Sequence, residues 1–147
     1  MDSMNSVELA KTIAKSFEGW SPVVYLCPAG YPTIAWGHRC AKNFPPVNQE
    51  QGEVLLTRDM MIAIIGALKY CPSLNQYPHR LAAIIDFCFN LGVGRLQTST
   101  LRRKINQGNF AVAERELSKW VHGGGRVLKG LVSRRMAEIA IMRKDNK

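Results

Sequence analysis

The chain has 147 residues, of which 46% are apolar and 21% charged, and its lysines and arginines outnumber its acidic residues by 20 to 11, a net charge of +9. This balance excludes a disordered or fibrous protein, and no run of about 18 apolar residues is present to form a transmembrane helix. The four cysteines and three histidines lack metal-ligand spacing, so we expect no metal and no other cofactor. The positive charge indicates an anionic partner.

The first predicted elements are a helix and a β-hairpin. Apolar residues recur at helical spacing over residues 7–17, and Gly19 follows as a left-handed helix end. Over residues 21–38, β-branched and aromatic residues flank a Pro-Ala-Gly-Tyr turn. This pattern predicts two strands, over residues 23–27 and 33–36.

The middle of the chain is predicted to form two helices. Asn48 begins a long helix that reaches about Cys71, with Gln51 at the capping-box position. Because its second half is apolar on most sides, we expect it to cross the middle of the molecule. A second buried helix begins near residue 79 and ends at Gly92.

The last part of the chain is predicted to be helical over residues 101–106, 111–120 and 131–142. Thr98 or Ser99 caps the first of these helices and Asn109 the second. The glycine triplet at 123–125 is predicted to be a flexible loop. A small β element within a helical chain indicates an α+β fold that is mostly helical.

Three residues around the predicted hairpin suggest a site of acid–base chemistry. Glu18 lies between Phe17 and Trp20, and a carboxyl held against aromatic rings stays protonated near neutral pH, as a general acid must. A tight hairpin brings Cys27 and Thr33 together, facing the helix end that presents Glu18. Taken singly, an exposed helix-end glutamate and an incidental thiol are the ordinary interpretations.

These residues resemble the signature of the phage lysozymes, or endolysins, of glycoside hydrolase family 24. That signature is Glu, eight residues, Asp or Cys, five residues and Thr, then Thr-Ile-Gly-x-Gly-His. Here it reads Glu18, Cys27 and Thr33, followed by TIAWGH. Blocks at residues 89–110 and 120–135 also resemble the family. Ala35 in place of Gly is interpreted as a small change on a strand, and a subset of endolysins has Cys in place of Asp.

The resemblance implies a lysozyme-like fold, with residues 1–147 as one domain. A β-containing lobe at about 18–60 and a helical lobe, formed by about 61–147 and the N-terminal helix, would be joined by the long helix, with the active-site cleft between them. The implied activity is muramidase: hydrolysis of the β-1,4 bond between N-acetylmuramic acid and N-acetylglucosamine, for bacterial cell lysis. The resemblance further implies inversion at the anomeric carbon, with Glu18 as general acid and with Cys27 and Thr33 orienting the attacking water. Direct attack by a Cys27 thiolate is the alternative.

The resemblance also places five further residues beside the substrate. We interpret the histidine as tying the hairpin to a neighbouring helix or loop, the asparagine as a partner for the sugar N-acetyl groups, and the phenylalanine as lining the cleft or packing in the core. These residues are His38, Phe89, Asn90, Thr100 and Arg134.

Two other functions remain open from the sequence. One is a lysozyme-fold wall-binding protein that has lost catalysis, and the other is a basic nucleic-acid-binding module. The aromatic residues lie away from the basic segments, so no stacking platform for nucleic acid is apparent. We therefore expect peptidoglycan and the anionic cell envelope as partners, and no nucleic acid.

The expected protein is a monomer that is made in the host cytoplasm and acts on the wall in the periplasm, with no visible signal peptide and no stable membrane insertion. Cys88 is expected to be a buried hydrophobe. Cys27 and Cys40 flank the hairpin, and a disulfide between them would block the site as a redox switch.

Overall fold

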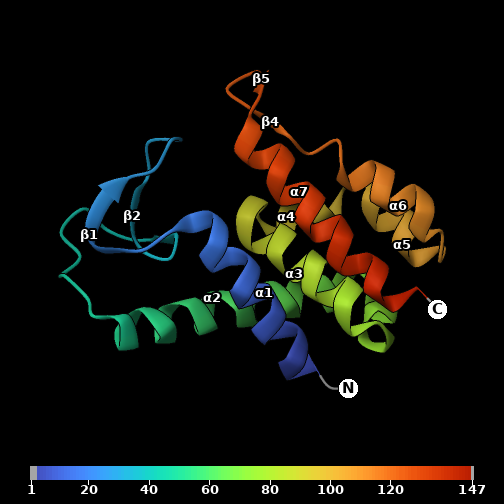
Figure 1. The fold of residues 1–147 in the computed structure, drawn as a ribbon, viewed down its shortest axis with the longest axis horizontal. Helices are drawn as coiled ribbons and strands as arrows, with labels where there is room; N and C mark the ends of the chain where they lie inside the picture. Colours follow the sequence, from blue (N-terminus) through green and yellow to red (C-terminus); the bar gives the residue numbers. More distant parts are fainter. Residues whose placement is uncertain (1–2, 147) are drawn as a thin grey trace.

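The computed structural model describes residues 3–146, which form seven α-helices and two small antiparallel sheets (Figure 1). This confirms the predicted α+β class with helix dominant. The predicted domain of residues 1–147 includes residues 1, 2 and 147, which lie outside the described part. The elements in chain order are α1 (Ser3–Glu18), β1 (Ser21–Leu26), β2 (Pro32–Ala35), β3 (His38–Arg39), α2 (Gln49–Tyr70), η1 (Pro72–Gln76), α3 (Pro78–Leu91), α4 (Val93–Gln97), α5 (Thr100–Asn106), α6 (Phe110–Leu117), β4 (His122–Gly123), β5 (Arg126–Val127), α7 (Lys129–Met142) and η2 (Arg143–Asp145).

Helix α1 confirms the first predicted helix, although it begins earlier, at Ser3. Its buried face carries Val7, Ala10 and Ala14, which recur at the spacing of one helical face. The helix ends at Glu18, and the N–H of Gly19 (φ 70°) donates to a carbonyl one turn earlier. The ending leaves Glu18 at the point where the chain passes from the helix into the first sheet.

Strands β1, β2 and β3 form a sheet in that order, and Tyr25 and Arg39 lie on either side of Thr33 in its register. The hairpin of β1 and β2 confirms the prediction, whereas the two-residue β3 is too short to show a strand pattern. Ala35 has φ 57°, in the left-handed region. Because a Cβ there costs about 1–2 kcal/mol, the interpretation of Ala35 as a small change on a strand was wrong.

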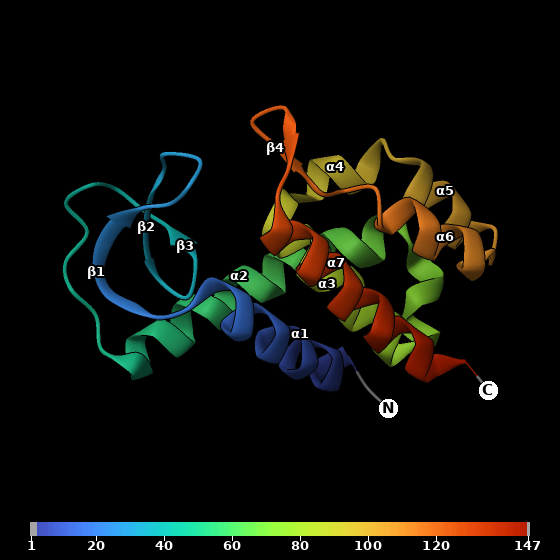
Figure 2. The same ribbon diagram turned by 45° about the horizontal axis from the view of Figure 1, so that its top comes forward.

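Helix α2 begins with the predicted capping box: Asn48 Oδ1 accepts from the Gln51 N–H (2.8 Å), and Gln51 Oε1 accepts from the Asn48 N–H (2.9 Å). It runs from beneath the sheet to the other helices (Figure 2). The helix is not buried on most sides, as its apolar second half had suggested, because Ile62 and Ile65 are each 66% exposed. Apolar residues on most sides of a helix did not, in this case, mean burial on most sides.

Helix α3 occupies the centre instead. Every residue from 80 to 88 is buried, and α1, α2 and α7 all pack against this helix. Pro78 lies in its first turn and Gly92 follows its last residue, which confirms the predicted end. One acidic residue, Asp86, lies within this buried stretch and is fully inaccessible to solvent.

The C-terminal helices confirm the predicted caps, since the side chains of Ser99 and Asn109 accept backbone N–H groups at the starts of α5 and α6. Helix α4 was not predicted. The glycine triplet is not a flexible loop: Gly124 (φ 59°) and Gly125 (φ 80°) form the two-residue turn between β4 and β5. That turn requires positive φ at both central positions, which glycine adopts without strain.

Candidate active site

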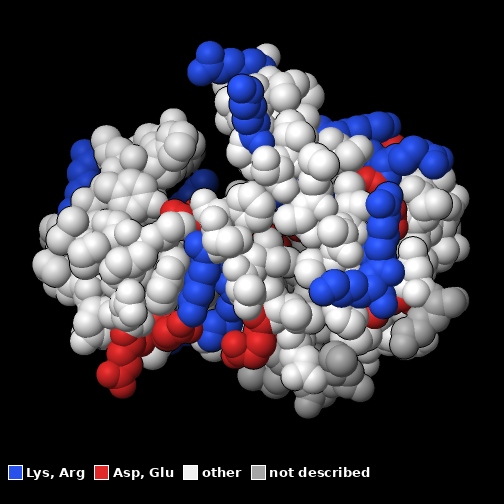
Figure 3. Space-filling model, viewed as in Figure 1, with Lys and Arg blue, Asp and Glu red and all other residues white. Residues whose placement is uncertain are grey.

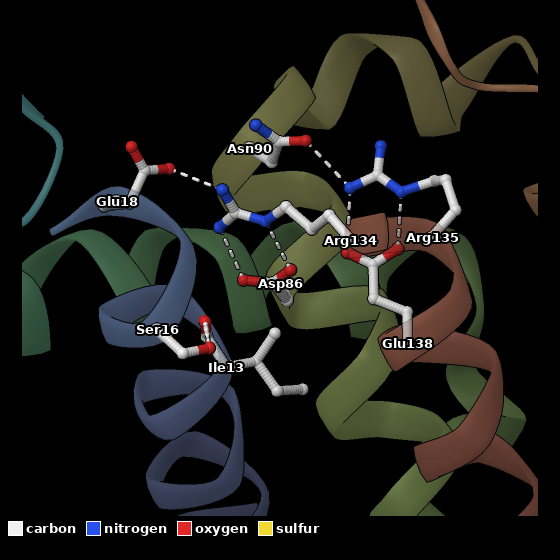
Figure 4. Close-up of polar contacts among 8 residues, drawn as sticks. All are labelled: Ile13, Ser16, Glu18, Asp86, Asn90, Arg134, Arg135 and Glu138. Atoms are coloured by element: carbon white, nitrogen blue, oxygen red, sulfur yellow. Dashed lines mark hydrogen bonds and ion pairs between the residues drawn. The ribbon is translucent and has the colours of Figure 1, made fainter. Parts of the chain in front are cut away.

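Glu18 lies where the sheet, α1 and α7 meet. Arg134 of α7 donates from Nη1 to Glu18 Oε2 at 2.6 Å, and the glutamate side chain is 22% exposed (Figure 4). The space-filling view shows the molecule hollowed between the three-stranded sheet and the β4–β5 hairpin (Figure 3). The predicted acid is therefore partly accessible and held by a cation.

The two aromatic neighbours of Glu18 in the sequence each contact another group. The Trp20 ring packs at a tilt against Trp36, with ring centroids 4.5 Å apart, and lies against Gly52 of α2. The Phe17 ring faces the Arg134 guanidinium, 5.6 Å from its centroid. Phe17 and Trp20 thus pack against other groups. The hydrogen-bond partner of the Glu18 carboxylate is Arg134, which lies 116 residues further along the chain.

Arg134 is fixed in turn by Asp86, which the sequence did not single out. Arg134 Nε and Nη2 donate to the two carboxylate oxygens of Asp86 at 2.9 and 2.8 Å. Burial opposes the charge of Arg134, but the hydrogen bonds and charges of Asp86 and Glu18 outweigh it and raise the pKa of Arg134. Such a bidentate pair fixes the plane of the guanidinium and so the direction of the donor that reaches Glu18.

The hairpin brings Cys27 and Thr33 together as predicted. Burial acts to raise the pKa of the Cys27 thiol, but its interactions with the backbones of Tyr31 and Ala29, with the Thr33 side chain and with the charge of Arg39 lower it below its ordinary value. The Thr33 hydroxyl itself donates to the Tyr31 carbonyl at 2.8 Å. Thr33 itself is buried. The thiol is therefore easier to ionise than a free cysteine, and a hydroxyl lies beside it.

Tyr25 interacts electrostatically with both Glu18 and Cys27, and the sequence analysis missed it. Burial, the charge of Glu18 and the charge of Cys27, in that order, raise the pKa of Tyr25. Residues two positions apart in a strand share a face, so Tyr25 and Cys27 lie on the same face of the hairpin. That alternation was the signal in the sequence that could have identified Tyr25.

Gly37 approaches the Glu18 carboxyl so closely that a Cβ on Gly37 (φ 73°) would lie 2.6 Å from Glu18 Oε1. We expect Gly37→Ala to lower activity by about 10²-fold, because a displacement of about 1 Å in a catalytic group has that effect. Lysis rate and thermal unfolding should be measured together. Gly108→Ala is the matched control, because Gly108 has φ 72° with nothing within 4 Å of an added Cβ. Equal losses of activity in the two variants would contradict the predicted contact.

Some of the other predicted residues lie near this site, and others do not. His38 Nδ1 lies 2.8 Å from Asp59 Oδ2 of α2, as expected for a residue that ties the hairpin to a helix. The Phe89 ring lies near Arg134, with the guanidinium 5.9 Å from its centroid. Asn90 accepts from Arg135 Nη2 at 2.7 Å through its side-chain carbonyl.

Thr100 lies elsewhere. It accepts a hydrogen bond from Arg103 within α5 (3.1 Å) and lines a pocket of about 420 Å³. Neither the hydrogen bond nor the pocket includes Glu18, Cys27 or Thr33. The pocket is lined by Leu91, Arg95, Thr100, Leu101, Glu116, Lys119, Trp120 and His122.

The four cysteines are all unpaired. Cys27 follows β1 and Cys40 follows β3, and these strands lie on opposite sides of β2. Two strand spacings place their backbones roughly 9–10 Å apart, beyond the span of a disulfide. The proposed redox switch therefore needs a rearranged sheet. Cys88 is buried as predicted, and burial, assisted by nearby charges, raises its pKa to about 12.

Known endolysins are similar to this chain in sequence. The chain is 34% identical over 139 residues to an endolysin of Bacillus phage B103 and spans 52% of its length. It is 35% identical to an endolysin of Acyrthosiphon pisum secondary endosymbiont phage 1, and the alignment covers 94% of this chain and 97% of that endolysin.

Solved structures share the fold. The P1 phage endolysin Lyz in its active form has a TM-score of 0.83 at 19% identity, with 93% of this chain and 84% of that chain covered. The muramidase domain of SpmX from Asticaccaulis excentricus has a TM-score of 0.78 at 25% identity, with 90% and 93% covered. The model of the family described as phage lysozyme matches residues 15–138, from the turn before Glu18 to the middle of α7. With this match and the relative of similar length, the chain belongs to the phage lysozyme family.

Proposed function

We propose that this protein is a peptidoglycan muramidase, an endolysin that hydrolyses the β-1,4 bond between N-acetylmuramic acid and N-acetylglucosamine and thereby lyses bacterial cells. The observation that carries the proposal is the partly exposed Glu18 carboxyl, paired with buried Arg134, on the same side of the molecule as the Cys27–Thr33 pair, since Tyr25 feels the charges of both Glu18 and Cys27. Membership of the phage lysozyme family supports the same activity.

In the proposed reaction, Glu18 protonates the leaving glycosidic oxygen. Cys27 and Thr33 orient a water molecule that attacks the anomeric carbon from the other face of the sugar, with inversion. Arg134 holds one oxygen of Glu18, and the close backbone of Gly37 limits where the other lies. This restriction keeps the donor in one direction, which is the geometric requirement for general acid catalysis.

Substrate contacts form the second part of the proposal. Phe89 lines the cleft, and the Asn90 amide N–H donates to an N-acetyl carbonyl while its carbonyl stays with Arg135. His38 acts indirectly, by holding the hairpin on α2. Thr100 is proposed as a more distant contact, at the pocket beside α5.

Positive charge supports an attraction to the anionic cell envelope. The net charge is +9, and lysine and arginine side chains gather over the β4–β5 hairpin and the α5–α6 region in Figure 3. Within residues 3–146, none of the helices has the length and apolar character needed to cross a membrane. We propose a monomer that reaches the wall in the periplasm and is drawn to its anionic surroundings.

Two lobes are part of the proposal. The sheet moves with the first part of α2, and the remaining helices form the second lobe, so that bending of α2 on the μs–ms timescale opens the site to the polymer. The exposed outer face of α2 leaves its backbone free of packing on that side.

The experiment is a turbidity assay on permeabilised Gram-negative cells, combined with detection of new reducing ends in purified peptidoglycan. We expect clearing of the cells together with N-acetylmuramic acid at the new ends. Binding to the wall without new reducing ends would instead support a wall-binding protein without catalysis. A steeply salt-dependent nucleic-acid gel shift without lysis would support the nucleic-acid-binding alternative.

A further inference from the structure

Behind Glu18 lies a buried chain of charged groups that extends away from the proposed site (Figure 4). Arg134 joins Glu18 to Asp86, and Arg135 contacts both Glu138 (2.9 Å) and Asn90 (2.7 Å). The Asp86 carboxyl also interacts with that of Glu138, and this interaction links the two halves. The side chains of Asp86 and Glu138 are both 0% exposed.

Asp86 and Glu138 cannot both be ionised at low cost. Both carboxyls are fully buried, so two ionised carboxylates would repel each other in a region of low dielectric constant. Two carboxyls that share a hydrogen bond need a proton between them. Burial first, and then the hydrogen bond and charge of Asp86, raise the pKa of Glu138 well above its ordinary value, although Arg135 acts to lower it.

Among the described residues, the other groups that face Glu138 and Asp86 are neutral or act through Arg134. Helix α3 contributes Cys88, whose pKa of about 12 keeps its thiol neutral. The Trp120 carbonyl accepts from Arg135 Nη1 at 3.3 Å and is uncharged. In the described part of α1, Glu18 reaches this chain of groups through Arg134. One proton on the Asp86–Glu138 pair therefore removes the repulsion between the two buried carboxylates.

We propose that Asp86 and Glu138 are positioning residues for Glu18: protonated Glu138 donates to Asp86, and Asp86 holds Arg134 and shares its charge with Glu18. This rests on the proposed role of Glu18 as the general acid. Arg134 then fixes the direction of the Glu18 carboxyl, while Asp86 already compensates part of the positive charge of Arg134. An arginine that faced Glu18 alone would favour the ionised carboxylate and oppose its role as a proton donor.

The first test is a titration of the Glu18 carboxyl carbon by ¹³C NMR, with the resonance assigned by its loss in Glu18→Gln. In Asp86→Asn, Arg134 faces only Glu18, so we expect the titration midpoint to move to lower pH by ~1–3 units. In Glu138→Gln, the amide still donates to Asp86, so the midpoint should stay near the wild-type value. If Asp86→Asn does not fold, the double variant Asp86→Asn, Glu138→Gln should show the same shift with an amide pair in place of the acids.

The second test is thermal unfolding against pH, which does not depend on lysis. Because folding raises the pKa of Glu138, its contribution to stability is present below the unfolded value of about 4.3 and is lost as pH rises toward the folded value. Glu138→Gln has no such loss, so the Tm of the variant minus the Tm of the wild type should increase as pH rises. Glu114→Gln, at an ion pair with exposed Arg143, is the control and should show no such gain.

Each part of the inference has a result that overturns it. An unchanged Glu18 midpoint in Asp86→Asn would show that Asp86 does not share the charge of Arg134. A Tm difference between Glu138→Gln and wild type that does not grow with pH would show that Glu138 is ionised. Failure of the wild-type protein to release reducing ends would instead refute the proposed function, because neither titration uses that readout.

Discussion

Glu18→Gln is expected to lower the rate of wall lysis by about 10²–10⁴-fold, because glutamine has nearly the same size but cannot deliver a proton to the leaving oxygen. The rate of clearing of permeabilised cells and the release of reducing ends both measure the loss. The fold should survive, since Arg134 keeps its bidentate contact with Asp86 when its contact with Glu18 weakens. Circular dichroism and the Tm would verify this.

Glu114→Gln controls for the loss of one negative charge from a basic protein. Glu114 lies on α6 and pairs with Arg143, remote from the proposed acid in sequence and in contacts. Its lysis rate should match that of the wild type. A folded Glu18→Gln protein that clears cells nearly as fast as the wild type would refute the assignment of Glu18 as the acid.

Cys27→Ala is expected to abolish most of the activity, whereas Cys27→Asp should retain a substantial part. The thiol and the Thr33 hydroxyl form a pair, and without the thiol the hydroxyl alone would orient the water poorly. A carboxylate of similar reach can accept the same hydrogen bonds. Initial rates of reducing-end release for the two variants would measure the difference.

The same pair of variants predicts a change in the pH profile. The site lowers the pKa of Cys27, yet a thiol still ionises at higher pH than an aspartate, whose ordinary pKa is about 3.9. If the ionised group is the active form, wild-type activity rises with pH through the pKa of the thiol. Cys27→Asp should remain active at lower pH, where the wild-type rate has already fallen.

Alkylation with iodoacetamide provides a chemical test of the same residue. Burial is the main factor that raises the pKa of Cys71 to about 11, and Cys88 reaches about 12, so neither competes at neutral pH. Cys40, whose pKa burial also raises, is the matched control position. We expect one adduct by intact mass and loss of activity in wild type and Cys40→Ala, and little loss in Cys27→Asp. If Cys27→Ala lyses cells at the wild-type rate, the thiol has no part in the reaction.

Local interactions in the sequence predicted much of the secondary structure. The capping box at Asn48 and Gln51 and the side-chain caps at Ser99 and Asn109 formed as expected, because each involves residues three positions apart. The proximity of Cys27 and Thr33 was also predictable, since a tight turn joins their strands. Short-range geometry fixes such contacts before the chain adopts its tertiary structure.

Errors arose where burial or backbone conformation depended on distant segments. Helix α2 carries exposed isoleucines because α3, with its small and apolar residues, fills the centre in its place. The glycine triplet forms an ordered turn because β4 and β5 pair on either side of it. A pattern of apolar residues or glycines does not specify what packs against it.

The sequence by itself determined the fold class and the positions of the main helices, and it led to the proposal that Glu18, Cys27 and Thr33 form the site. Only the tertiary structure decided what surrounds the proposed acid. Its neighbours in sequence pack elsewhere, and its cation comes from α7, fixed by a buried aspartate of α3 that is 48 residues from Arg134. The physical reason is that a charge is stable inside a protein only beside its partners, and the packing of α1, α3 and α7 brings those partners together.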